Sequence, residues 1–148
     1  MLDKWDKRFF ELAQVVATWS KDPDCQVGAV LVSPDRRSYS QGYNGFAIGV
    51  ADCDKLHDKD EKNKLMLHAE VYAILNARRD LTGWSIYTTK APCMACASVI
   101  IQAGLTTLVC PFPEATSRWQ VENLEALTLL KNAKVSSRFI RHDDLKTN

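Results

Sequence analysis

The sequence predicts an α/β fold built on a mixed sheet of five strands that is flanked by helices. Short runs rich in β-branched residues recur along the chain, and amphipathic segments with helical spacing stand between most of them. Only the first two strands follow each other without a helix between them. We therefore expect an antiparallel opening hairpin and mostly parallel strands after it. We expect residues 1–148 to form one domain, because no linker or internal repeat interrupts the pattern.

The first elements are a helix and the strand hairpin. Apolar residues from Phe9 to Trp19 recur at helical spacing, and Ser20-Lys-Asp-Pro-Asp ends the helix. Residues 26–33 (QVGAVLVS) are typical of a buried strand. Pro34-Asp35 marks a turn, and residues 36–43 are predicted to form the hairpin partner.

A bend and a polar stretch come next. Gly42-Tyr-Asn-Gly45 is predicted to turn the chain, because glycine and asparagine tolerate positive φ. We interpret the charged stretch 51–64 (ADCDKLHDKDEKNK) as a long surface loop or insert.

After this stretch, helices and strands alternate regularly. A proline at position 92 favours a helix start, and Gly104 favours a helix end. The predicted helices are 68–79, 93–103 and 121–132, and the predicted strands are 84–89, 105–110 and 135–141.

Composition narrows the partners and the compartment. The net charge of +1 provides no strong field for a polyanion, so we expect no nucleic-acid polymer as partner. The five cysteines are odd in number and irregularly spaced, which argues against a disulfide framework and favours a reducing compartment. The first residues lack an apolar targeting segment, and no apolar run approaches the roughly 18 residues that span a bilayer. We expect no membrane association and a cytoplasmic location.

Two short motifs together predict a catalytic metal centre. His68-Ala-Glu70 and Pro92-Cys-Met-Ala-Cys96 form the H-x-E…P-C-x-x-C pattern of zinc-dependent nucleobase deaminases. One imidazole and two thiolates leave a fourth position of zinc open for water or substrate. Cys93 and Cys96 are three residues apart, which places both sulfurs on one face of a helix start, where thiolates are favoured.

Glu70 is the predicted acid–base group. Two thiolates balance the charge of a zinc ion, so this centre acidifies its water less than a tri-histidine site does and needs a nearby base. The carboxylate of Glu70 stands beside the motif and can move protons between water, ring and leaving amine. The alternative is a non-enzymatic zinc module or nucleotide-binding regulator, which predicts a closed sphere of four protein ligands.

The chain resembles the cytidine deaminase superfamily and, more narrowly, deoxycytidylate (dCMP) deaminases. Four blocks spread over most of the chain carry the resemblance: Ser20-Lys-Asp-Pro with Gln26-Val-Gly-Ala29; Gly42-Tyr-Asn-Gly45; His68-Ala-Glu70 with Ala73-Ile74; and Pro92-Cys93…Cys96-Ala with Ile100-Ile-Gln-Ala-Gly104.

The resemblance implies a three-layer cytidine-deaminase-like fold and hydrolysis of dCMP to dUMP and ammonia, which feeds thymidylate synthesis. It implies zinc on His68, Cys93 and Cys96, with Glu70 as proton shuttle. It also implies backbone contacts of Ala69 and Ala91 with the pyrimidine edge and a contact of Asn44 with the sugar.

Regulation is implied by the same resemblance. In the family, dCTP activates and dTTP inhibits a homo-hexamer through a site that includes the G-Y-N-G block, here Gly42, Tyr43, Asn44 and Gly45. A bound triphosphate would bring Mg²⁺. The family usually has Asn where this chain has Tyr72, and a phenol offers one polar group and more bulk, which weakens sugar or phosphate contacts there. A common Lys is replaced by Ser98.

Several interpretations stay open. The same chemistry could act on free cytidine, guanine or a tRNA adenosine. Lys62, Lys64 and Arg118 are candidates for phosphate recognition, although lysines on a charged loop are usually only solvated. Tyr43 either stacks on a base or is a buried turn aromatic, and Trp119 is expected to pack the last helix.

A second metal site is also considered. Cys25, Cys53 and His57 could bind a structural zinc, although free thiols and a surface imidazole are the preferred interpretation. Cys110 is expected to be a small core residue, and His142 is given no role.

Overall fold

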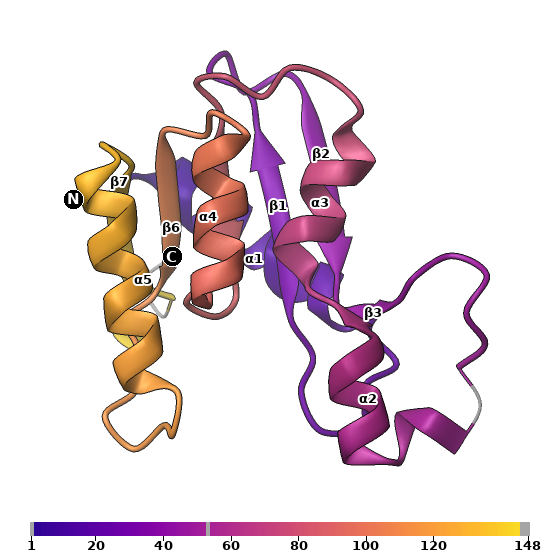
Figure 1. Ribbon diagram of the computed structural model, residues 1–148. Coiled ribbons are helices and arrows are strands. Elements are labelled where there is room, and N and C mark those ends of the chain that lie inside the picture. Colours follow the sequence, from indigo (N-terminus) through magenta and orange to yellow (C-terminus); the bar gives the residue numbers. More distant parts are fainter. Residues whose placement is uncertain (1, 53, 146–148) are drawn as a thin grey trace.

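A computed structural model describes residues 2–52 and 54–145, with a five-stranded main sheet in the order β2-β1-β5-β6-β7 (Figure 1). Strand β1 pairs antiparallel with both β2 and β5, whereas the β5–β6 and β6–β7 pairs are parallel. The mixed sheet with an antiparallel opening hairpin is therefore confirmed. The strands are β1 Gly28–Val32, β2 Tyr39–Tyr43, β5 Ser85–Thr88, β6 Thr107–Pro111 and β7 Ser136–Ile140.

Helices cover both faces of the sheet and complete three layers (Figure 1). Helix α1 (Lys4–Ala17) lies on one face, and α3 (Ala69–Ala77), α4 (Met94–Gln102) and α5 (Gln120–Asn132) lie on the other. A short 3₁₀ turn, His142–Leu145, follows β7. Within the described ranges, no helix combines the length and apolar character that a bilayer crossing requires.

The interior strand β1 contributes side chains to two separate apolar cores. All five of its residues are buried, and successive side chains point to opposite faces. Val30 and Val32 pack in the cluster beneath α1, whereas Ala29 and Leu31 pack beneath α3 and α4. The sheet thus separates a core beneath α1 from a core that supports the functional motifs.

Two glycines let helices approach the sheet closely. A Cβ at Gly28 would lie 2.1 Å from the carbonyl oxygen of Ala13 in α1, and one at Gly42 would lie 2.3 Å from the Ala73 nitrogen in α3. Neither Gly42, Asn44 nor Gly45 has positive φ, so the expected reason for this block is wrong. Close packing of β2 against α3 is what excludes a side chain at Gly42.

The interpretation of residues 51–64 as a loop is partly wrong. The stretch contains a 3₁₀ turn, Asp54–Leu56, and helix α2, Lys59–Leu65, which leads into β4, Met66–Leu67; β4 pairs with β3, Gly45–Phe46. The side chain of Asp58 caps α2 by accepting hydrogen bonds from two backbone N–H groups of the first turn. The sequence did not predict this helix, because the stretch is rich in charged residues and the residue that the helix buries, Lys62, is itself charged.

Candidate metal centre and substrate pocket

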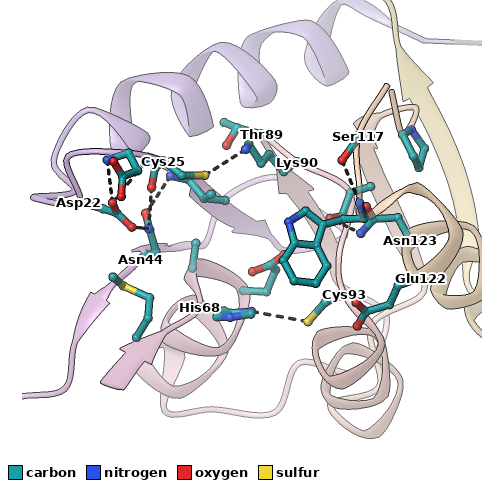
Figure 2. A pocket seen from close by; sticks show the side chains of 18 of the residues that line it. Asp22, Cys25, Asn44, His68, Thr89, Lys90, Cys93, Ser117, Glu122 and Asn123 are labelled. Atoms are coloured by element: carbon teal, nitrogen blue, oxygen red, sulfur yellow. Dashed lines mark hydrogen bonds between the residues drawn. The ribbon is translucent and has the colours of Figure 1, made fainter. Parts of the chain in front are cut away.

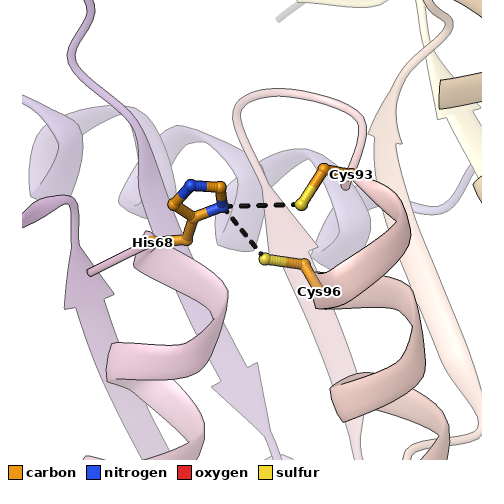
Figure 3. A group of neighbouring side chains, drawn as sticks. All are labelled: His68, Cys93 and Cys96. Carbon is orange, nitrogen blue, oxygen red and sulfur yellow. Dashed lines mark hydrogen bonds between the residues drawn. The ribbon is translucent and has the colours of Figure 1, made fainter. Parts of the chain in front are cut away.

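The two sequence motifs meet at the starts of α3 and α4 (Figure 3). His68 and Cys93 are the residues immediately before α3 and α4, whereas the sequence predicted them as the first residues of these helices. Cys96 lies in the first turn of α4. The Nδ1 atom of His68 is 3.3 Å from the Cys96 sulfur and 3.5 Å from the Cys93 sulfur. One donor atom from each residue lies within 4.8 Å of the others.

The donor spacing fits a tetrahedral zinc ion. Zn–N and Zn–S bonds of about 2.1 and 2.3 Å at a tetrahedral angle separate nitrogen from sulfur by about 3.6 Å. The two observed separations, 3.3 and 3.5 Å, are close to that value. Among the described residues, the group contains only three ligands, as expected for a zinc centre with an open position.

The thiols are electrostatically prepared for a cation. A hydrogen bond from the Cys96 thiol, followed by one from His68, lowers the pKa of Cys93 to about 4. The same thiol–thiolate hydrogen bond, together with burial, raises the pKa of Cys96. The hydrogen bond to Cys93 raises the pKa of His68. The side chains of His68 and Cys96 therefore carry protons that binding of a divalent metal would release.

Glu70 is buried beside the metal donors. Its exposed fraction is 4%, and the Cys96 thiol donates to its Oε2 atom over 3.7 Å. No ion pair involves Glu70 among the residues that the structure describes. Burial raises the pKa of this carboxyl above its ordinary value, against the opposing effect of nearby His68. A carboxyl with a raised pKa beside a metal centre is suited to accept and return a proton.

The metal donors open into a pocket of about 700 Å³, which lies within the range of about 300–1,000 Å³ for small-molecule sites. One wall comes from the 22–25 turn and Asn44, and the opposite wall comes from residues 111–123 (Figure 2). Lys90 and the segment that follows it join the two walls.

The three residues predicted to bind substrate, Asn44, Ala69 and Ala91, all line this pocket. The amide of Asn44 already has partners, since its Oδ1 accepts from Val27 N and its Nδ2 donates to the Cys25 carbonyl, each over 2.8 Å. The Ala91 carbonyl accepts a 3.3 Å hydrogen bond from Asn123. The contacts with sugar and base therefore stay predictions.

Tyr43, the aromatic residue of the predicted regulatory block, lies outside the pocket. Tyr43 stacks on Tyr72 with 5.3 Å between ring centroids and meets the edge of Trp19 at 6.2 Å. Neither Tyr43 nor Tyr72 lines the pocket. Tyr72, which stands where the family usually has Asn, thus belongs to an aromatic cluster between β2 and α3 and does not narrow the pocket.

The cations predicted from sequence have different surroundings. Lys62 is 4% exposed and pairs with Asp22 at 2.9 Å and with Asp24, so its charge is already neutralised. Lys64 is exposed, pairs with Glu61 and does not line the pocket. Arg118 does line the pocket and lies over the Trp119 ring.

Sequence reasoning missed most of the wall formed by residues 111–123. Trp119 is 54% exposed and lines the pocket, so the expectation that it packs the last helix is wrong. Glu122 accepts a 3.4 Å hydrogen bond from Met94 N, and Asn123 donates to the carbonyl of Pro92 over 3.0 Å. No short motif marks these residues, because they reach the site only when α5 packs beside α4.

The predicted second metal site of Cys25, Cys53 and His57 lies only partly within the described residues. Cys25 accepts a 3.0 Å hydrogen bond from the ammonium of Lys90, whereas Cys53 lies outside the described residues. Cys110 is fully buried, as expected.

Comparisons with known proteins agree with this geometry. Residues 3–111 match a family model described as the cytidine and deoxycytidylate deaminase zinc-binding region. The chain is 40% identical over 148 residues to an uncharacterized deaminase encoded in the luxG 3′ region of Aliivibrio fischeri, covering 99% of this chain and all of that protein. It is 43% identical over 105 residues to a probable deoxycytidylate deaminase of Caenorhabditis elegans, covering 68% of this chain but only 53% of that one.

A solved structure shares the fold. The dCMP deaminase of cyanophage S-TIM5, crystallised with dCMP and dUMP, superimposes with a TM-score of 0.78 at 22% sequence identity. The match covers 95% of this chain and 99% of the phage protein. At this identity, the likeness shows that the two chains share the three-layer architecture.

Proposed function

The chain belongs to the cytidine and deoxycytidylate deaminase zinc-binding family, and on that premise we propose that it hydrolyses dCMP to dUMP and ammonia. The observation that carries the proposal is the buried Glu70 carboxylate beside three donors spaced for zinc. The choice of dCMP is supported by the relatives named deoxycytidylate deaminase, which match about two thirds or more of this chain.

The division of labour follows from chemistry. His68, Cys93 and Cys96 hold zinc, which when bound supplies a Lewis acid that lowers the pKa of a water molecule. Glu70 takes the proton of that water on a carboxylate oxygen and delivers it to the ring nitrogen next to C4. As the water oxygen adds to C4, the same carboxylate takes the second proton of that oxygen and passes it to the amine, so that the C4–N bond breaks and ammonia leaves. Its burial excludes bulk water and raises its pKa above the ordinary value.

Substrate orientation comes from the backbone around the two motifs. Ala69 and Ala91 would bond the edge of the pyrimidine, since both line the pocket next to metal donors. Asn44 would contact the sugar, for which one of its present hydrogen bonds to Val27 or Cys25 would have to be shared.

The finer features follow the resemblance. We propose that dCTP activates and dTTP inhibits, with Mg²⁺, through a site near Gly42, Tyr43, Asn44 and Gly45 in a homo-hexamer. We also propose a cytoplasmic enzyme that supplies thymidylate synthesis. Gly42 has a packing role that accounts for its identity without a nucleotide, so regulation needs a test of its own.

The decisive experiment measures ammonia release by zinc-loaded protein from dCMP, deoxycytidine, cytidine, guanine and tRNA. We expect dCMP to have the highest kcat/KM, raised by dCTP and lowered by dTTP. A higher kcat/KM on any other substrate would refute the dCMP assignment while leaving the deaminase chemistry intact. Absence of any response to either triphosphate would refute regulation alone.

A further inference from the structure

We propose that Lys90 binds the substrate phosphate and thereby makes the pocket select a nucleoside monophosphate over the free nucleoside. The inference rests on the proposed function, because it assigns a residue to one end of the same substrate. Lys90 belongs to none of the sequence motifs, and it lines the pocket in the structure.

The charged side chains of the pocket wall include slightly more acids than bases. Apart from the metal donors, its charged side chains are five acids and four bases: Asp22, Asp24, Glu70, Glu114 and Glu122 against Lys59, Lys62, Lys90 and Arg118. A phosphate dianion in such a wall requires a cation that no carboxylate neutralises. The choice is therefore among four residues.

The other three cations have different surroundings, although Lys59 and Arg118 form no ion pair within the described ranges. Lys62 is buried between the carboxylates of Asp22 and Asp24. Lys59 begins α2 among acidic residues, directly between Asp58 and Asp60. The guanidinium of Arg118 stacks on Trp119, with its Cζ atom 4.7 Å from the ring centroid.

Lys90 differs from Lys62 and Arg118, because its ammonium contacts only a thiol. Its Nζ atom donates to the Cys25 sulfur over 3.0 Å, and it forms no ion pair with any residue in the described ranges. A thiol is a weak acceptor that phosphate oxygens readily replace. Figure 2 shows Lys90 across the pocket from His68 and Cys93, at the side remote from the metal donors.

The backbone holds Lys90 at a defined distance from the metal centre. It lies three positions before Cys93, and three residue steps of the chain span at most about 10 Å, the length scale of a nucleoside. Thr88 donates a 2.7 Å hydrogen bond to the Lys90 carbonyl, and Asn123 anchors the next two carbonyls. One anchored segment thus carries both a zinc ligand and the cation, with the base and the phosphate at its two ends.

The test measures binding of dUMP and of deoxyuridine to the zinc-loaded protein by calorimetry. We expect K90Q to weaken dUMP binding roughly tenfold to a hundredfold, the usual worth of a hydrogen bond to a charged group, and to leave deoxyuridine binding within about twofold. K59Q and R118Q are matched charge controls, each expected to weaken dUMP binding less than about threefold. K90R should recover part of the affinity, because it restores the charge.

Three other outcomes would overturn the inference. Unchanged dUMP affinity in K90Q would exclude the contact, and equal weakening of both ligands would show a structural effect. Wild-type protein that binds dUMP no tighter than deoxyuridine would also exclude it. If dCMP yields no ammonia while dUMP binding still depends on Lys90, the proposed reaction fails and the phosphate site stands.

Discussion

Two buried carboxylates on opposite faces of the sheet have opposite surroundings. Asp6, beneath α1, is 2% exposed and accepts hydrogen bonds from the Tyr87 hydroxyl at 2.9 Å, from Arg138 at 2.6 Å and from Asp3 N at 3.1 Å. Glu70, on the pocket side, is 4% exposed; it accepts a hydrogen bond from a thiol at 3.7 Å and one from its own backbone N–H, and it forms no ion pair within the described residues. Burial is the same, so the partners decide whether a carboxylate stabilises the fold or remains reactive.

The largest expected effect is on catalysis, from Glu70→Gln. The amide keeps the shape of the side chain but cannot carry the proton, so we expect kcat on dCMP to fall by about 10²–10⁴-fold or more. Metal content should stay at that of wild type, and the melting temperature should not fall, because a buried charge is removed. Metal analysis, thermal unfolding and ammonia release check these three values. Undiminished turnover would show that Glu70 is not the proton carrier.

Gly42→Ala tests the contact that positions Glu70. Its new Cβ would lie 2.5 Å from the Ala69 carbonyl oxygen as well as against Ala73, in a helix backbone that cannot yield cheaply. We expect a loss of about 3 kcal/mol in unfolding free energy together with reduced kcat, because α3 carries both His68 and Glu70.

Gly45→Ala is the matched control within the same four-residue block. Its Cβ would have Tyr43 Cε2 as nearest neighbour at 3.9 Å, which is ordinary contact. Urea denaturation should therefore show a change within about 0.5 kcal/mol. Equal destabilisation by both substitutions would contradict the packing explanation of Gly42.

Asp6→Asn tests the other buried carboxylate, the one beneath α1. It leaves the Arg138 guanidinium without its carboxylate, so we expect a loss of about 2–3 kcal/mol, below the value for a fully buried pair because Arg138 is 35% exposed. The kcat of the folded variant, measured well below its melting temperature, should stay near that of wild type. A large loss of activity with unchanged stability would reverse the roles assigned to the two faces.

The parts of the molecule that sequence could predict are those with local signals. Strand β1 is buried along its whole length and was recognisable as a β-branched run, and the spacing of His68, Cys93 and Cys96 follows from tetrahedral coordination. The helix at 59–65 was missed because its buried residue, Lys62, is a charged one whose partners lie about 40 positions earlier.

The wall formed by residues 111–123 was missed for a similar reason. Glu122 and Asn123 reach the zinc motif only through the packing of α5 against α4, and no local pattern encodes that contact. The role of Gly42 likewise depends on how close α3 lies to β2, a distance that the residue itself does not reveal.

Asp22 is a third buried carboxylate, at the pocket edge, and provides the finest test of the comparison. Burial acts to raise its pKa, but the Lys62 ammonium and two backbone N–H groups outweigh burial and hold the pKa below its ordinary value. A carboxyl with a lowered pKa in the folded state stabilises that state above its unfolded pKa of about 3.9, and the stabilisation disappears as the pH falls through the folded value.

At pH 7, Asp22→Asn should lose only about 1 kcal/mol of unfolding free energy, because Asp24 still pairs with Lys62. Urea denaturation between pH 7 and pH 3 should show the difference between wild type and variant shrinking below about pH 4. A difference that stays constant down to pH 3 would mean that the pairing with Lys62 adds nothing, because the ionised and the protonated carboxyl would then stabilise the fold equally.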